Sequence, residues 1–165
     1  MGRKVIFMLI VFCHFGCADF ELHVRKDSGT SGVSVFLLCP FEVRSMNYDP
    51  YISDEFIDSL KYELFCRGRD SVVLPKSVTV SGSESAWAAK TCGEYSGDIL
   101  IKGVISQRET GFFSDRSIST VISFIIYNRK GGIIGEGFYH DDQPAGDNSV
   151  KKDAARKLVS SLLEK

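Results

Sequence analysis

The segment Val33–Leu74 constrains the fold most, because it holds an apolar run, an amphipathic stretch and a second apolar run. The first run, 33–38, stops at Pro40 and predicts a short buried strand. The second run, Ser71–Leu74, predicts another strand. Two strands joined by a helix need a crossover connection, so we expect these strands to lie parallel in one sheet.

An amphipathic helix is predicted between these two strands. Its apolar residues recur at three- and four-residue spacing and form one stripe, consisting of Phe56, Ile57, Leu60 and Leu64. We expect Ser53 to cap the helix, with Asp54 and Glu55 in its first turn, where the helix dipole favours negative charge. Gly68 is expected to provide the left-handed exit at the other end.

The rest of the chain predicts three more strands and two more helices. The strands are expected at 98–107, 117–128 and 133–140, and the first helix at 83–92, with Trp87 as a core residue. A last helix is expected from Asn148 or Ser149 to Leu163. Its apolar stripe would be Val150, Ala154, Leu158 and Leu162, and its solvated face Lys151, Lys152, Arg156 and Lys157.

The order of these elements is β-α-β-α-β-β-β-α. It predicts an α+β fold, an α/β sandwich in which two to three helices pack on a mixed sheet of four to five strands. A chain of 165 residues is long enough for one such domain. We expect the globular domain to comprise residues 33–165, preceded by a Ser- and Gly-rich tether at 18–32 that holds a short edge strand.

Residues 1–17 are typical of an export signal. Arg3 and Lys4 form a positive start, and Val5–Cys13 is an apolar stretch too short to span a bilayer. Gly16-Cys17 resembles the end of a bacterial lipobox, which implies lipidation of Cys17 and anchoring by several acyl chains. The alternative is a buried N-terminal strand or helix.

The charge of the chain argues against nucleic acid as a partner. The formal net charge is −1, and it becomes about −3 without Arg3 and Lys4, whereas phosphate binding depends on clustered cations. Outside the N-terminus the chain has no run of eighteen apolar residues, so no internal membrane span is expected.

Few residues suggest catalysis or metal binding. Cys39, Cys66 and Cys92 follow the signal; they are either small buried apolar residues or one disulfide and one free thiol. His140 with Asp141 and Asp142 could hold a metal, but neighbours on a strand point to alternate faces. No catalytic signature is present. We therefore expect no enzyme, no cofactor and no metal, with a nucleophilic cysteine paired with His140 as the alternative.

Two polar loops carry large apolar side chains that no stripe explains. Met46, Tyr48 and Tyr51 lie in or beside the loop Arg44–Pro50, and Phe112 and Phe113 lie in the loop Glu109–Arg116. Clustered surface aromatics mark interaction sites, so we expect these five residues to bind a partner. The alternative is that Phe112 and Phe113 fold back to cap the core.

The chain also resembles a family of bacterial envelope lipoproteins. The resemblance rests on Cys39-Pro40-Phe41, the helix Asp54–Leu60, the strand Val72–Leu74, the strand Gly97–Ile105 and the turn at 128–132. These stretches are similar to the TolB amino-terminal domain and its relatives, including CsgG, LptE and the lipoprotein activators of penicillin-binding proteins. The fold of that family is similar to the anticodon-binding domain of class II synthetases.

The resemblance implies a non-catalytic protein of the cell outer membrane. The lipid-anchored domain would face the periplasm and bind an envelope protein or an assembly partner. The loop Glu109–Arg116 is too short for the membrane-inserting hairpin of CsgG, so a pore is not expected. The alternatives are an exported thiol- or histidine-dependent enzyme and a subunit of a ring-like secretion complex.

Overall fold

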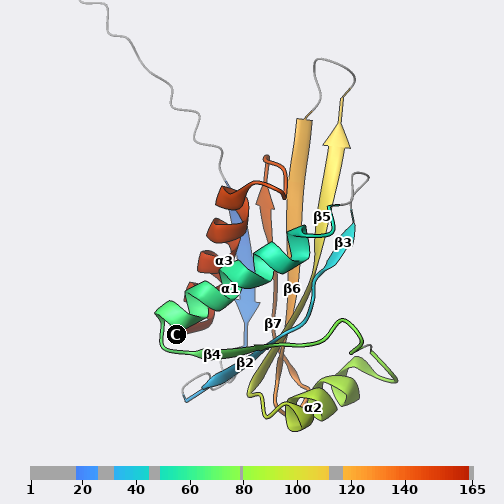
Figure 1. Cartoon of the computed structure of the whole chain (residues 1–165), viewed down its shortest axis with the longest axis vertical. Helices are drawn as coiled ribbons and strands as arrows, with labels where there is room; N and C mark the ends of the chain where they lie inside the picture. The colour runs from blue at the N-terminus through green and yellow to red at the C-terminus, as the bar shows by residue number, and fades with distance from the viewer. Residues whose placement is uncertain (1–17, 26–31, 45–48, 79, 112–116, 164–165) are drawn as a thin grey trace, which may run out of the picture.

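The structure is a computed structural model that describes residues 18–25, 32–44, 49–78, 80–111 and 117–163 (Figure 1). Helices pack on a mixed sheet of seven strands in the order β1-β7-β6-β5-β2-β4, with β3 pairing with β5 beside this path. The elements are β1 (Asp19–Val24), β2 (Val35–Leu38), β3 (Glu42–Arg44), α1 (Ile52–Cys66), β4 (Asp70–Val73), α2 (Glu84–Glu94), β5 (Ile99–Thr110), β6 (Ser117–Asn128), β7 (Ile133–Asp141) and α3 (Asn148–Leu163). The predicted α+β class is confirmed, with more strands than the four to five expected.

The expected crossover unit is present. β2 and β4 are parallel, with Val35 opposite Asp70 and Leu38 opposite Val73. The predicted stripe of α1 is buried against the sheet. Gly68 has a φ of +66°, the left-handed conformation that a helix exit favours in glycine.

The start of α1 differs from the prediction. The helix begins at Ile52, and Tyr51 occupies the N-cap position without a capping side chain. Ser53 is buried, and its hydroxyl accepts a hydrogen bond from the backbone N–H of Phe41 at 2.9 Å. Ser53 therefore satisfies a buried donor of the preceding loop, and the prediction of Ser53 as the cap was wrong.

The C-terminal strands form an antiparallel meander. β5 and β6 pair along their whole lengths, from Ile99 opposite Asn128 to Thr110 opposite Ser117. β7 pairs with β6, and β1 pairs with β7 as an edge strand. β5 reaches three residues beyond its predicted end, so Glu109 and Thr110 belong to the strand and the loop is shorter than expected.

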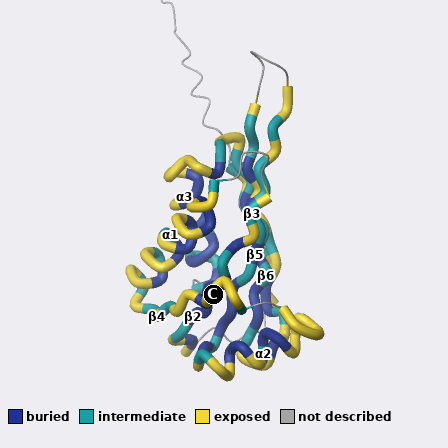
Figure 2. The backbone as a smooth tube through the Cα atoms, turned by 45° about the vertical axis from the view of Figure 1, so that its right-hand side comes forward, coloured by how far each residue is buried: buried dark blue, intermediate teal, exposed yellow. Residues whose placement is uncertain are grey.

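One face of the sheet carries α1 and α3 and holds the larger core (Figures 1 and 2). Three phenylalanine rings meet at its centre: Phe41 lies 4.9 Å from Phe56 and 6.2 Å from Phe124, between ring centroids. Gly103 allows this approach, because a Cβ there would lie 2.3 Å from the Phe41 ring and 2.2 Å from the Ser123 carbonyl oxygen.

Among the described helices, α2 is the one that packs on the opposite face, and it covers one end of that face. Trp87 is 6% exposed in this smaller core, which confirms its predicted core position. The Ser83 hydroxyl caps α2 by accepting from the Ala86 N–H at 3.3 Å, as the sequence suggests. The helix continues through Gly93 and ends at Glu94, two residues beyond its predicted end.

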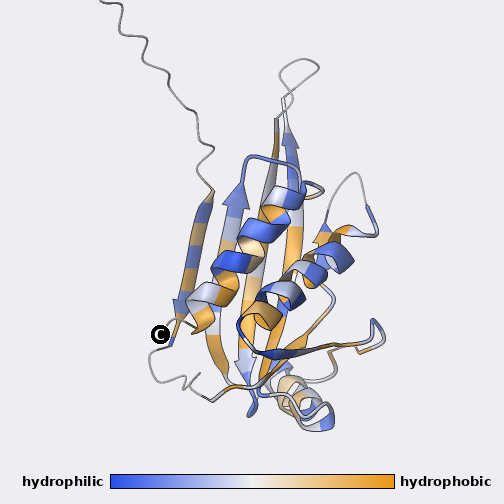
Figure 3. Ribbon diagram, turned by 60° about the vertical axis from the view of Figure 1, so that its left-hand side comes forward, coloured by the Kyte–Doolittle hydropathy of each residue, from blue (hydrophilic) through white to orange (hydrophobic). Residues whose placement is uncertain are grey.

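Two short strands complete the sheet. The apolar alternation of Phe20, Leu22 and Val24 forms β1, which Figure 3 shows as alternating hydrophobic and hydrophilic stripes. β3 spans Glu42–Arg44 and overlaps the predicted loop Arg44–Pro50 only at Arg44; it pairs in parallel with β5. Three residues of mixed polarity carry no alternation signal, so the sequence did not reveal β3.

Candidate functional site

The structure describes the two loops predicted to bind a partner only in part. Met46, Tyr48, Phe112 and Phe113 lie outside the described residues, as does Cys17. Tyr51 is described, and 67% of it is exposed at the start of α1. Its backbone N–H donates to the Asp49 carboxylate at 2.9 Å, so the ring is held at the surface beside the first loop.

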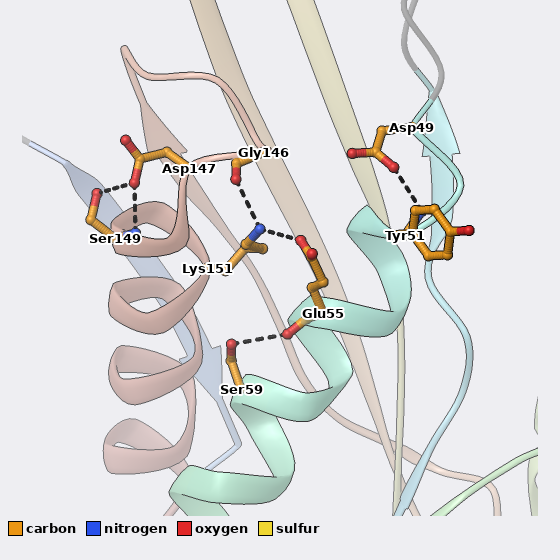
Figure 4. A network of polar contacts seen from close by, with 8 residues as sticks. All are labelled: Asp49, Tyr51, Glu55, Ser59, Gly146, Asp147, Ser149 and Lys151. Carbon is orange, nitrogen blue, oxygen red and sulfur yellow. Dashed lines mark hydrogen bonds and ion pairs between the residues drawn. The ribbon is translucent and has the colours of Figure 1, made fainter.

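A buried lysine of α3, Lys151, contacts α1 (Figure 4). Lys151 is 2% exposed, and its ammonium donates to Glu55 at 2.5 Å and to the Gly146 carbonyl at 2.9 Å. Lys151 was predicted on the solvated face of α3, and that prediction was wrong. A charge so deeply buried needs paired acceptors, and Glu55 and Gly146 supply them.

The first turn of α3 is fixed next to this pair. Asp147 accepts from the backbone N–H of Ser149 at 2.7 Å and from its hydroxyl at 2.8 Å. These hydrogen bonds, with the backbone one first, hold the pKa of Asp147 below its ordinary value. Asp147 therefore caps the start of α3, whereas the sequence predicted that the helix would begin with Asn148 or Ser149 as its cap.

A polar groove runs along the outer side of the α1–α3 pair. It encloses about 820 Å³ and is lined by Asp58, Ser59, Tyr62, Glu63, Ser149, Lys152, Asp153 and Arg156. Most of its charged groups already have partners within the chain. Arg67 pairs with Glu63 at 2.6 Å, and Lys157 pairs with Asp153 at 2.9 Å. The lining residues include three acids and two bases, so the groove carries a net charge of −1.

A second aromatic surface lies on the other flank of α1, beside the edge strand β4. Tyr62 and Phe65 are 66% and 79% exposed. Both line a cavity of about 460 Å³ together with Asp58, Lys61, Arg69, Asp70 and Ser71. Tyr62 and Phe65 were not among the predicted contact residues. The sequence held a signal for them, because both lie off the apolar stripe Phe56–Leu64. On that part of the helix surface, contact with solvent favours polar residues.

The thiols of Cys39 and Cys92 are buried. Burial raises the pKa of Cys39 to about 12 and also raises the pKa of Cys92. Thiolate nucleophiles need a lowered pKa, so neither site favours this chemistry. All three described cysteines are free, and Cys66 is exposed at the end of α1.

The histidine at the end of β7 forms one weak ion pair. The His140 ring nitrogen lies 3.6 Å from the Asp142 carboxylate. Among the described residues, no group of three His, Cys, Asp or Glu side chains is arranged to hold a metal. In the same part of the chain, none of the helices has the length and apolarity needed to cross a membrane.

Searches with known proteins found structural similarity only. The chain superposes on the PelC dodecamer from Paraburkholderia phytofirmans with a TM-score of 0.63, at 12% identity, covering 88% of this chain and 97% of that chain. A hypothetical protein from Chlamydia trachomatis gives a TM-score of 0.53 at 11% identity, covering 81% and 99%. No family model matches the chain, and no curated protein matches it.

At these identities the likeness shows a shared fold. The fold match to PelC covers 88% of this chain and 97% of that chain. The resemblance to TolB and CsgG stays a prediction, because no family model matches.

Proposed function

We propose that this chain is a bacterial outer-membrane lipoprotein, anchored through Cys17, whose periplasmic domain binds an envelope protein or an assembly partner without catalysis. The observation that carries the proposal is the fold match to PelC, a bacterial protein described as a dodecamer, across 97% of its chain. A domain of this shape is thus used elsewhere as a unit of an assembly. The positive start, apolar stretch and Gly16-Cys17 of residues 1–17 supply the anchor.

The surface chemistry supports binding more than catalysis. Exposed aromatic side chains occur at both ends of α1, with Tyr51 at its start and Tyr62 and Phe65 near its end. Aromatic residues dominate the energy of protein interfaces, because they bury a large area with little loss of side-chain freedom. An enzyme that uses Cys39 or Cys92 is disfavoured, because burial raises the pKa of both thiols.

The anchor is tested by metabolic labelling with radioactive palmitate. Cys17→Ser should abolish the label and leave the protein unprocessed or in the soluble periplasm. Cys66→Ser is the matched control, because it removes an exposed thiol from the folded domain. Equal labelling of the Cys17→Ser variant and the wild type would contradict the lipoprotein proposal.

Partner binding is tested by crosslinking in the native envelope. Tyr51→Ser should reduce recovery of a crosslinked envelope protein, because Tyr51 lies beside the proposed contact loops. Phe138→Ser serves as the control, because Phe138 is also an exposed aromatic residue, 39% exposed, but lies on β7 outside the proposed contact surfaces. Unchanged recovery with both variants would leave no role for Tyr51 in binding.

The phenylalanines at 112 and 113 are tested by the double change to Ser. If they contact the partner, the melting curve stays unchanged while co-purification is lost. If they cap the core, stability falls and binding falls with it. An unchanged melting curve with unchanged co-purification would contradict both roles.

A second candidate function is a subunit of a ring-like secretion complex. The dodecameric state described for PelC favours it, since a ring needs subunits that expose two different complementary surfaces. The mass of the particle extracted in mild detergent distinguishes a single copy bound to a partner from an assembly of many copies of this chain.

A further inference from the structure

The sheet ends at β4, which pairs only with β2 within the described ranges. The backbone N–H groups of Asp70 and Leu74 donate to carbonyls in and next to β2, so these residues face that strand. Alternation along the strand then directs the backbone groups of Ser71 and Val73 away from β2. Proteins often block such an edge with a lysine or a proline, and Ser71 and Val73 are neither. The β4 edge can therefore accept another strand.

A groove lies between this edge and α1, whose end turns directly into β4 (Figure 1). The groove is the cavity of about 460 Å³, and both elements line it: Asp58, Lys61, Tyr62 and Phe65 of α1, then Arg69, Asp70 and Ser71. Tyr62 and Phe65 lie three residues apart on the helix, so their exposed rings are neighbours. A strand added to β4 would therefore point every second side chain towards this aromatic pair.

Arg69 brings an unpaired hydrogen-bond donor to the groove. One terminal nitrogen of its guanidinium donates to the Val33 carbonyl at 2.7 Å, while its Nε is buried and has no partner among the described residues. A buried donor without an acceptor is unfavourable. A carboxylate satisfies Nε and the second terminal nitrogen together, because its two oxygens match the guanidinium fork. The geometry therefore favours a carboxylate in whatever occupies the groove.

The other charged residues of the groove do not neutralise Arg69. Lys61 and Asp58 pair with each other at 3.2 Å. Asp70 lies opposite Val35, which packs with the smaller core on the α2 side of the sheet. Because residues opposite each other share a face, the Asp70 side chain lies on that side as well. The positive charge of Arg69 thus remains for a ligand on the α1 side of the edge.

We propose that the groove between α1 and β4 binds an extended segment of another envelope protein, which adds to β4 as a new edge strand. The segment carries an apolar side chain and, two positions away on the same face, a Glu or Asp side chain. The apolar side chain lies against Tyr62 and Phe65, and the carboxylate binds Arg69. The inference rests on the proposed binding function and names the surface and the chemistry of the partner.

A second copy of this chain matches the groove less well. Its other outer strand is β1, whose Phe20 and Leu22 pack against the larger core. The acids Asp19 and Glu21 alternate with these residues and lie on the other face. An added β1 would therefore place no carboxylate two positions from an apolar side chain on the same face. This pattern favours a strand from a different protein.

Peptide binding to the detergent-extracted full-length chain tests the carboxylate. The probes are short fluorescein-labelled peptides that alternate apolar and polar residues and contain Phe-Thr-Glu or Glu-Thr-Phe, one for each strand direction. One of them should bind at least about tenfold more tightly than the same peptide with Gln in place of Glu. Equal binding of the Glu and Gln peptides, or no binding of either probe, would overturn the proposal.

Two arginine variants locate the binding site of the carboxylate. Arg69→Gln should reduce the preference for Glu over Gln to less than about twofold, because the fork that binds the carboxylate is gone. Arg67→Gln is the matched control, since Arg67 lies one turn away and already pairs with Glu63 at 2.6 Å. It should keep the full preference. A preference that survives Arg69→Gln would overturn the assignment.

The strand addition is tested through the backbone. Ser71→Pro removes an outward N–H without removing a bond to β2, and it should weaken peptide binding about tenfold or more, whereas Ser71→Ala should bind like the wild type. N-methylation of the peptide, one nitrogen at a time, gives the same test without changing the protein. Binding should be lost at every second nitrogen. Tolerance of N-methylation at all positions would contradict strand addition.

Photo-crosslinking in the native envelope separates this inference from the proposed function. Benzoylphenylalanine in place of Phe65 should crosslink to a segment of an envelope protein that holds an apolar residue two positions from Glu or Asp. Crosslinks from the position of Tyr51 alone would keep the binding function and reject this inference. Crosslinks from the position of Phe65 to a second copy of this chain would also reject it. No crosslink from either position would reject both proposals.

Discussion

The two faces of the sheet differ in how completely helices cover them. α1 and α3 cover one face along its length and enclose a large apolar core, whereas α2 covers only one end of the other face. Beyond α2 that second face leaves Val121 36% and Phe138 39% exposed. We infer that packing on the first face supplies most of the free energy of folding. Substitutions on the uncovered face or at the sheet edges should therefore leave the domain folded.

The largest effect should come from truncation in the larger core. Phe124 and Leu60 are at most 1% exposed and lie in the same cluster. Phe124→Ala should lower the free energy of unfolding by about 3–5 kcal/mol and Leu60→Ala by about 2–5 kcal/mol, because each leaves a cavity. Urea denaturation measures this, and a loss below about 1 kcal/mol would mean that the first face does not dominate stability.

The buried Lys151 should have the next largest effect, through its packing rather than its charge. Lys151→Ala should lower the free energy of unfolding by about 2 kcal/mol, because it leaves a hole and removes the link from α3 to Glu55 and Gly146. Lys151→Met keeps the volume and should cost less than about 1 kcal/mol, since Glu55 is half exposed and regains water. Equal losses for the two variants would assign the effect to the ion pair.

Asp98 should show a smaller effect that depends on pH. Its carboxylate accepts from the backbone N–H groups of Ser34 and Val35 at 2.9 and 3.1 Å, which hold its pKa below the ordinary value. Asp98→Asn should lower the free energy of unfolding by about 1 kcal/mol at pH 7.

The sign of this pH dependence follows from the lowered pKa. The stabilisation by Asp98 is complete above the unfolded-state pKa of about 3.9 and is lost as the pH falls through the lower folded-state value. The difference between wild type and Asp98→Asn in urea melts should therefore shrink below pH 4. A difference that stays constant from pH 7 to pH 3 would contradict a role of the ionised carboxylate.

The smallest effect should come from the uncovered face. Phe138→Ser should change the free energy of unfolding by less than about 0.5 kcal/mol, because the ring is already 39% exposed beyond α2. Trp87→Ser, a change of the α2 residue that is buried against the same face, is the contrasting variant and should destabilise strongly. A loss above about 2 kcal/mol for Phe138→Ser would show that this face also supports the fold.

Periodic elements were predictable because their signal is local. The alternation of β6 predicted its bounds, Ser117–Asn128, and the predicted stripe of α3 contained four of its seven buried residues. Lys151 was missed because a lysine in a charged run resembles its solvated neighbours, and only the approach of α1 buries it. Ser53 was missed for a related reason, since its partner Phe41 lies twelve residues earlier and meets it only in the fold.

The candidate site was less predictable than the fold. Of the five expected contact residues, only Tyr51 lies in the described part of the chain, and it is exposed. The aromatic pair Tyr62 and Phe65 depends on where the β4 edge lies in the sheet. Edge positions follow from strand order, which a single sequence does not encode locally.

The most direct test of the central claim is the mass and location of the wild-type, full-length chain extracted from native bacterial membranes in mild detergent. The account predicts that the chain is found in the membrane fraction, in a particle that contains several copies or a stoichiometric envelope partner. A single copy recovered without a partner from the soluble fraction would contradict both the anchor and the assembly role.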